Sequence, residues 1–274
     1  MSSMAERKAA GLGPAISLGD VVPAPRYAAR VWRRNARVFA KVWKGALLPN
    51  FFDPLFYLVA LGFGLGTYLA TIEGVPYRDF IAPGLIASAA MWAASFECTY
   101  NVYLKMHESK LYDAVLATPV EIADLAAGDI AWGATRATIY GTTFLGIVAI
   151  FGLLESAWAI LIPLFVFLGG LAFSVLGYTF TALIPKIDLY SYYFTLIITP
   201  MFLFSGIFFP FDRLPGIAEI VAWFTPLFHL VEITRGLATG PEALAILGHA
   251  AWLAIFSALL FYIPVRALHA RLLA

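Results

Sequence analysis

An all-α integral membrane protein is the fold class that the sequence predicts, and three observations predict it. Of the 274 residues, 61% are hydrophobic and only 13% are charged, which is about half the charged share of a soluble domain. The mean hydropathy is +0.83. Apolar runs recur along the chain, each close to the roughly 20 residues that a helix needs to cross a bilayer.

Six transmembrane helices are expected, separated by breaks rich in charge, proline or glycine. Their predicted ranges are 51–71, 81–104, 130–153, 158–183, 189–209 and 243–264. Residues 1–25 carry no apolar core after Arg7 and Lys8, so they are expected to form a flexible tail rather than a secretory signal. The remaining chain from residue 47 to 274 is expected to form one transmembrane domain.

The distribution of Lys and Arg predicts the orientation of these spans. With the N-terminus placed in the cytoplasm, fourteen of the eighteen basic residues fall on the cytoplasmic side and three on the other, with Arg136 inside a span. Cytoplasmic loops carry such an excess of Lys and Arg. Both termini are therefore expected in the cytoplasm.

Residues 26–46 precede the first span and predict an amphipathic helix. Basic residues recur every three or four positions on one face, and Val31, Trp32, Phe39 and Trp43 lie on the other. Such a helix lies in the headgroup layer of a membrane. It serves either as an orienting anchor alone or as an anchor whose basic side also meets a soluble partner protein.

The segment from Lys105 to Asp129 is the one sizeable cytoplasmic segment expected between spans. A short helix is predicted over 107–116. Thr118 then reads as a helix cap, with Pro119 at the first position and Glu121 reaching back to the cap amide. A short helix held at the base of two spans can transmit a push, but the pattern is equally that of a simple helix hairpin.

The chain contains no G-x-x-x-x-G-K-[ST] phosphate-binding loop. It also lacks H-E-x-x-H and G-x-S-x-G, so no enzyme motif is present and no cofactor site is expected. Energy for uphill transport would come from another chain or from an ion gradient. Cys98 is the single cysteine, so an internal disulfide is excluded, and its apolar surroundings predict a packing residue.

Two ionisable residues fall within the predicted spans. Glu97 and Arg136 lie at similar depths, each about 10 Å from the cytoplasmic end of its helix. Because charges inside a membrane are costly, the two are expected to pair. The pair either fixes the register of the helices or lines a polar part of a transport route.

The stretch after the fifth span combines a stop, a reversal and a restart. In "SGIFFPFDRLP", Pro210 ends the span, Asp212 can cap the next helix, and Pro215 suits the first turn of that helix. The residues after Pro215 carry charges at helical spacing. They are too polar to span a bilayer and too apolar for an ordinary loop.

The quoted stretch and its sequel, "SGIFFPFDRLPGIAEIVAWFTPLFHLVEITRG", resemble the signature of the membrane subunit of ABC-2 type exporters. "LYDAVLATPVEIADLAAGDI" is similar to the cytoplasmic loop of that family. "DPLFYLVALGFGLG", "FECTYNVY" and "ITPMFLFSG" are similar to the nodulation-protein J branch, the lipo-oligosaccharide exporter permeases. The resemblance covers residue 26 to the end.

The resemblance implies the permease of an ATP-driven exporter in the bacterial inner membrane. It implies a homodimer that binds two copies of a cytoplasmic ATPase, with ATP and Mg on that partner and none in this chain. The implied substrate is an amphipathic lipid-linked or lipo-oligosaccharide. A drug or natural-product exporter of the daunorubicin type is one alternative, and an ATP-independent channel or structural membrane protein is another.

The resemblance also implies three groups of site residues. Coupling to the ATPase is implied for His107, Glu108, Lys110, Leu111, Tyr112, Leu116, Thr118, Pro119 and Glu121. An extracytoplasmic gate of two short re-entrant helices, 215–224 and 226–238, is implied for Ser205, Gly206, Pro210, Asp212, Pro215 and Pro226. Aromatic residues that could line the substrate path are Phe56, Tyr57, Tyr100, Tyr103, Tyr193 and Phe202.

Overall fold

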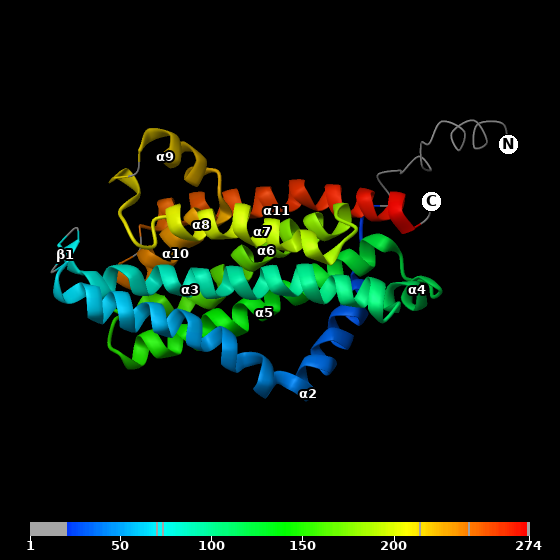
Figure 1. Cartoon of the computed structure of the whole chain (residues 1–274), viewed down its shortest axis with the longest axis horizontal. Coiled ribbons are helices and arrows are strands. Elements are labelled where there is room, and N and C mark those ends of the chain that lie inside the picture. The colour runs from blue at the N-terminus through cyan, green and yellow to red at the C-terminus, as the bar shows by residue number, and fades with distance from the viewer. Residues whose placement is uncertain (1–20, 70, 73, 214, 241, 273–274) are drawn as a thin grey trace.

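A computed structural model describes residues 21–69, 71–72, 74–213, 215–240 and 242–272. The described chain is almost wholly helical, and its long helices lie side by side in one elongated bundle (Figure 1). Most of the expected N-terminal tail, residues 1–20, lies outside the described residues. Figure 1 shows α4 (Leu111–Leu116) near one end of the bundle and α9 (Gly216–Trp223) near the other, and we name the two ends after these helices.

The expected amphipathic helix and the start of the first expected span form one helix, α2 (Pro25–Tyr57). Its axis bends part-way along (Figure 1). The helix continues through a π-helical stretch (Leu58–Gly64) and a 3-10 turn (Leu65–Thr67). A small antiparallel hairpin of β1 (Thr71–Ile72) and β2 (Val75–Pro76) then reverses the chain at the α9 end.

The second expected span is α3 (Tyr77–Phe96), which continues through π-helical stretches at Glu97–Asn101 and Leu104–Glu108. Lys110 adopts a left-handed φ of 47° and separates this helix from α4. The chain returns as α5 (Ile122–Ile150).

The expected cap at Thr118 is wrong. The Thr118 hydroxyl instead donates to the carbonyl of Val115 at the end of α4. The capping box forms three residues later, where Glu121 is the cap and Asp124 reaches back to the Glu121 amide. Glu121 and Asp124 have the same three-residue spacing as Thr118 and Glu121, and their carboxylates are stronger acceptors than a hydroxyl.

After a 3-10 turn (Ala157–Leu161), α6 (Ile162–Leu183) runs from the α9 end to the α4 end. The fifth expected span consists of several short helical pieces joined end to end. They are a 3-10 turn (Ile187–Leu189), α7 (Tyr190–Tyr193), a π-helical stretch (Phe194–Ile198) and α8 (Thr199–Phe204).

The excursion at the α9 end contains a 3-10 turn (Phe211–Arg213), α9 and α10 (Pro226–Thr239). Pro215, rather than Asp212, is the residue before the first turn of α9, and no side chain caps that helix, so the expected Asp212 cap is wrong. Thr225 caps α10 by accepting from the amide of Phe228. The last helix is α11 (Ala243–Leu272).

The helices α3, α5 and α6 form the centre of the bundle, where α3 is buried along nearly its whole length. Glycines let these helices approach closely. A Cβ atom on Gly170 of α6 would lie 2.7 Å from the Cβ of Ala137 on α5. By contrast, α11 exposes large apolar side chains such as Leu244 and Leu259, as a helix facing lipid would.

Among the described residues, four helical stretches are long and apolar enough to cross a membrane. They are Tyr77–Glu108, Ala157–Leu183, Ile187–Phe204 and Ala243–Leu272. The other two expected spans are also helical but differ in length or polarity. Pro54–Thr67 is a shorter apolar helix, and α5 carries Asp124, Asp129 and Arg136.

Candidate functional site

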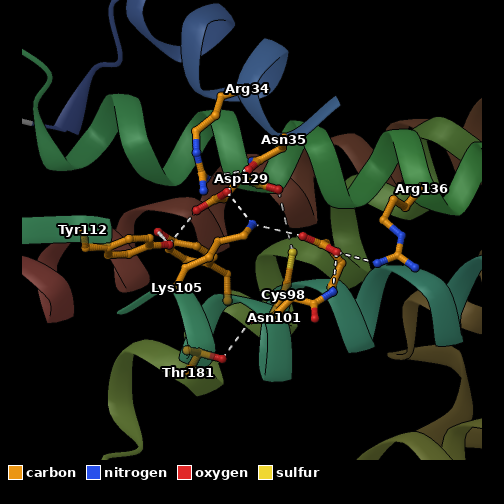
Figure 2. A network of polar contacts seen from close by, with 11 residues as sticks. Arg34, Asn35, Cys98, Asn101, Lys105, Tyr112, Asp129, Arg136 and Thr181 are labelled. Carbon is orange, nitrogen blue, oxygen red and sulfur yellow. Dashed lines mark hydrogen bonds and ion pairs between the residues drawn. The ribbon is translucent and has the colours of Figure 1, made fainter. Parts of the chain in front are cut away.

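A buried polar network lies in the half of the bundle nearer to α4 (Figure 2). Its charged members are Glu97 and Lys105 from the π-helical end of α3, and Asp129 and Arg136 from α5. Three further helices, α2, α4 and α6, contribute polar side chains. The network therefore ties together five helices that are separate in the sequence.

Glu97 accepts hydrogen bonds from three side chains. Arg136 donates through Nη1 at 2.6 Å, Lys105 through Nζ at 3.0 Å and Asn101 through Nδ2 at 2.6 Å. Glu97 is only 3% exposed. A carboxylate this deeply buried is stable only when charged donors surround it, and here both oxygens have them.

Asp129 is the second carboxylate, and it is 1% exposed. Oδ1 accepts from Lys105 Nζ at 2.9 Å and from Asn35 Nδ2 at 2.6 Å, and Oδ2 accepts from the Tyr112 hydroxyl at 2.6 Å. Lys105 thus bridges Glu97 and Asp129 (Figure 2). Two carboxylates and two cations balance in this chain of ion pairs.

Tyr112 carries the network into α4. Its ring is fully buried, and its hydroxyl also lies 2.9 Å from the hydroxyl of Tyr178 on α6. Burial, with the charge of Asp129 adding to it, raises the pKa of Tyr112 well above its ordinary value. The phenol therefore stays protonated and donates its one hydrogen bond to Asp129, so Tyr178 must donate to Tyr112.

The residues assigned to ATPase coupling are divided by the structure between the surface and the core. Most lie on the surface of the α4 end: His107, Glu108, Lys110, Thr118, Pro119 and Glu121. Leu111 and Leu116 are partly buried, and Tyr112 lies inside the network. The segment is therefore an exposed surface whose buried anchor, Tyr112, binds the buried carboxylate of Asp129.

Aromatic rings from α3 and from the fifth expected span form a continuous stack, which we call the aromatic stripe. Phe194 lies with its ring centre 5.7 Å from Trp92, 4.5 Å from Phe96 and 5.6 Å from Tyr100, in stacked orientations. Tyr190 continues the contacts to Tyr100 and Tyr103. Phe96 keeps 39% of its surface exposed.

Four of the six aromatic residues assigned to a path belong to this stripe or extend it. Tyr100 and Tyr103 lie within it, and Phe202 connects Trp92 to Tyr57. Tyr193 packs behind the stripe, fully buried and within 3.3 Å of the Ser95 hydroxyl. Phe56 is set apart, because it is 63% exposed and stacks on Phe52.

The residues assigned to a gate gather at the α9 end. Gly206 has a left-handed φ of 79°, and its carbonyl accepts from Arg235 Nη2 of α10 at 2.6 Å. The Ser205 hydroxyl lies 3.2 Å from that of Thr225, the cap of α10. Pro215 and Pro226 stand at the starts of α9 and α10. Pro210 is partly buried, and Asp212 is exposed in the preceding turn.

A histidine pair joins α10 to α11 at the same end. Nδ1 of His229 lies 2.8 Å from Nδ1 of His249, and Nε2 of His229 lies 2.9 Å from the Trp223 carbonyl. Because a carbonyl only accepts, His229 must donate through Nε2. Its neutral ring then accepts at Nδ1, so His249 donates through Nδ1. Among the described residues no group of three or more His, Cys, Asp or Glu side chains could hold a metal ion.

The fold and the site define a multi-pass membrane protein whose polar centre connects to an exposed helical segment. A profile of the family described as ABC-2 type transporter matches residues 28–238, and the chain belongs to this family. It is a membrane permease of the ABC-2 type.

The chain is also similar to individual named proteins. The chain is 38% identical over 245 residues to nodulation protein J of Rhizobium leguminosarum bv. viciae, covering 89% of this chain and 94% of the relative. It is 35% identical over 243 residues to nodulation protein J of Rhizobium meliloti strain 1021, covering 89% and 93%. Identity to the inner membrane transport permease YadH of Escherichia coli K12 is 21% over 202 residues, covering 74% and 78%.

Proposed function

We propose that this chain is the permease half of an ATP-driven exporter that moves an amphipathic lipid-linked or lipo-oligosaccharide out across the inner membrane. The observation that carries the proposal is the hydrogen bond from Tyr112 to Asp129. It fixes the exposed α4 segment to the charged network of the bundle. A force applied to α4 by a soluble partner would therefore reach α3 and α5 directly.

The partner in this proposal is a separate ATPase, bound in two copies to a dimer of this permease. ATP and Mg would be held by that partner. The excess of Lys and Arg at the α4 end supports a cytoplasmic position for this end and for both termini. The exposed residues Glu108, Lys110 and Asp113 give the α4 segment a polar surface suited to a soluble protein.

The aromatic stripe supports an oligosaccharide as the transported group. Aromatic faces are large, flat and apolar, and the C–H faces of sugar rings stack on such surfaces. Phe96 and Tyr57 remain 39% and 43% exposed, so the stripe is open on one side for a substrate or for a second copy. Several stacking positions in series would let a chain of sugars move in short steps.

The helices α9 and α10 would form the exit gate, dipping into the outer leaflet. The helix α9 has eight residues, too few to span, and its exposed side chains include Ile217, Ile220 and Val221. Such a short apolar helix suits a position within one leaflet. The contact between Arg235 and the Gly206 carbonyl would hold the hinge of this gate to α10.

The test is whether the chain forms a complex with an ATPase through α4. The permease is purified after co-expression with a candidate ABC ATPase, chosen first from the genes beside its own. The variant Ala114→Arg places a long cation on the exposed face of α4 and is expected to abolish co-purification. Arg213→Glu, exposed at the other end, is the control. Equal ATPase recovery in both variants would contradict the docking assignment, and no ATPase with the wild type would favour the channel alternative.

The substrate class is tested in the same complex reconstituted in vesicles. An acylated oligosaccharide is expected to stimulate ATP hydrolysis, and Phe194→Ala should reduce this stimulation because Phe194 contacts three rings of the stripe. Leu259→Ala, at a position 72% exposed on α11, is the matched control. Stimulation by an apolar drug alone would instead favour the drug-exporter alternative.

A further inference from the structure

A cavity of about 520 Å³ lies beside the polar network, between α2, the end of α3 and α5. Three cations, Arg34, Lys105 and Arg136, line it together with a single carboxylate, Glu97. Asp129, which does not line the cavity, forms an ion pair with Lys105. The wall therefore carries more positive than negative charge, although it lies within an apolar bundle.

Arg34 is the cation that this charge balance leaves over. It points from α2 toward the network (Figure 2), and its Nη1 donates to Asn35 Oδ1 at 3.0 Å. Among the described residues no carboxylate forms an ion pair with it. Arg136 also has an unsatisfied donor, because its buried Nε–H has no acceptor in the described part of the chain.

Beyond Arg34 and Asn35, the α2 side of the cavity is apolar. Val38, Phe39 and Val42 come from α2, and Val38 and Val42 remain 52% and 57% exposed. A free anion would gain nothing from this apolar part. A molecule with an anionic head and an acyl tail would fit this face of α2, with the head at Arg34 and the tail along Val38 and Val42, one and two turns further on.

We propose that this cavity binds the headgroup of a membrane phospholipid that carries a net negative charge. The site belongs to one copy of the chain, it stands apart from the aromatic stripe, and it does not depend on which substrate is exported. A lipid held there would fasten α2 to the charged network and complete the charge balance that Arg34 leaves open.

The experiment compares two lipids that differ in the headgroup alone. The full chain, purified in an uncharged detergent, is titrated with dioctanoyl phosphatidylglycerol or with dioctanoyl phosphatidylcholine, and bound lipid is counted by native mass spectrometry. The anionic lipid is expected to bind at least tenfold more tightly, which equals about 1.4 kcal/mol. Equal binding of the two lipids would overturn the proposal.

Matched variants locate the site on α2. Arg34→Gln is expected to weaken binding of the anionic lipid about tenfold, as for the loss of one hydrogen bond to a charged group, whereas Arg34→Lys should retain most of it. Arg33→Gln removes the same charge from an exposed neighbour outside the cavity and should change binding less than twofold. Equal losses in Arg34→Gln and Arg33→Gln would overturn the proposal, since they would indicate general attraction to a basic helix.

Two further measurements keep the test decisive. Val38→Glu adds a carboxylate at an exposed position of the apolar part of the cavity. It should weaken binding of the anionic lipid, and it tests the site independently if Arg34→Gln fails to fold. Inorganic phosphate in large excess is expected to leave the lipid bound. Displacement of the lipid by inorganic phosphate would overturn its assignment to a lipid headgroup.

Discussion

Lys105 is the residue on which the buried charges depend. Its Nζ lies 3.0 Å from Glu97 and 2.9 Å from Asp129, so it serves two acids at once. Arg136 forms its ion pair with Glu97 through Nη1, and its Nη2 donates a hydrogen bond to the Tyr140 hydroxyl. Removing one partner from a buried pair costs about 3–5 kcal/mol because a charge stays behind unpaired.

This geometry predicts an incomplete rescue when Glu97 and Arg136 are exchanged. Glu97→Arg and Arg136→Glu should each abolish the recovery of folded protein. The double variant should recover only in part, because the guanidinium introduced at position 97 lies beside Lys105. Adding Lys105→Gln should raise the yield further, as measured by size-exclusion chromatography and thermal unfolding in detergent. Full recovery of the double variant would show that Lys105 contributes nothing.

The Tyr112 hydroxyl gives a second prediction. Tyr112→Phe keeps the ring but leaves Asp129 Oδ2 without its donor and Tyr178 without its acceptor. The free energy of unfolding should fall by about 1–3 kcal/mol. Tyr192→Phe, in a ring that is 57% exposed, should change it by much less. Similar shifts in the two thermal transitions would contradict a structural role of the Tyr112 hydroxyl.

Depth within the predicted spans was enough to draw attention to Glu97 and Arg136. Lys105 and Asp129 were missed because the spacing placed them in a loop. The end of α3 continues to Glu108 through two π-helical stretches. Lys105 therefore lies on this helix, eight residues after Glu97 and on the same face, rather than in a loop. The signal that could have found the network is the polar run Glu97, Asn101 and Lys105 at intervals of four.

At the scale of elements, α5 and α6 depend on glycine for their close contact. A Cβ atom on Gly170 would lie 2.7 Å from Ala137 Cβ and 3.0 Å from Ala134 Cα, and neither atom can move without its helix. Gly170→Ala should therefore destabilise the protein by about 1–3 kcal/mol. Gly146→Ala, on the open side of α5 with nothing within 4 Å, should be neutral or stabilise by up to about 1 kcal/mol. Thermal unfolding of both variants makes the comparison.

The histidine pair between α10 and α11 predicts how the stability of the fold depends on pH. Burial, and then the neighbouring His249 ring, lower the pKa of His229 to about 4, against about 6.5 in an unfolded chain. As pH falls from about 6.5 to about 4, the unfolded state takes up this proton and the folded state does not, so stability falls. His229→Asn should flatten this slope in thermal unfolding measured from pH 7.5 to 4.5. An unchanged slope would contradict the assignment.

Element boundaries followed the sequence where proline marks them. Pro215 and Pro226 stand at the starts of α9 and α10, as the sequence indicated. The break expected between residues 46 and 51 is absent, because α2 continues through Pro49 and Pro54 as one bent helix. A proline limits one hydrogen bond but does not decide whether a helix stops or bends. The packing of the flanking turns decides that, and local sequence does not contain it.

At the scale of the molecule, the two ends of the bundle have different chemistry. The α4 end is polar and is joined to buried charges, whereas the α9 end exposes Ile217, Ile220 and Phe224. Between them the aromatic stripe follows α3. The sequence indicated this polarity through its Lys and Arg distribution, but Trp92, Phe96 and Phe194 became a stripe only once α3 and the fifth helical segment were paired in space.

Cys98 gives this polarity a practical use. It is the one cysteine of the chain, and it is fully buried where α3 meets Gly133 and Gly177. A maleimide that cannot cross membranes should leave it untouched, so the wild-type chain is already a blank for topology mapping. Tyr68→Cys, at a site 87% exposed, should label once the outer membrane of cells is made permeable, while Lys110→Cys should label only in inverted inner-membrane vesicles. The reverse labelling pattern would show that the α4 end faces away from the cytoplasm.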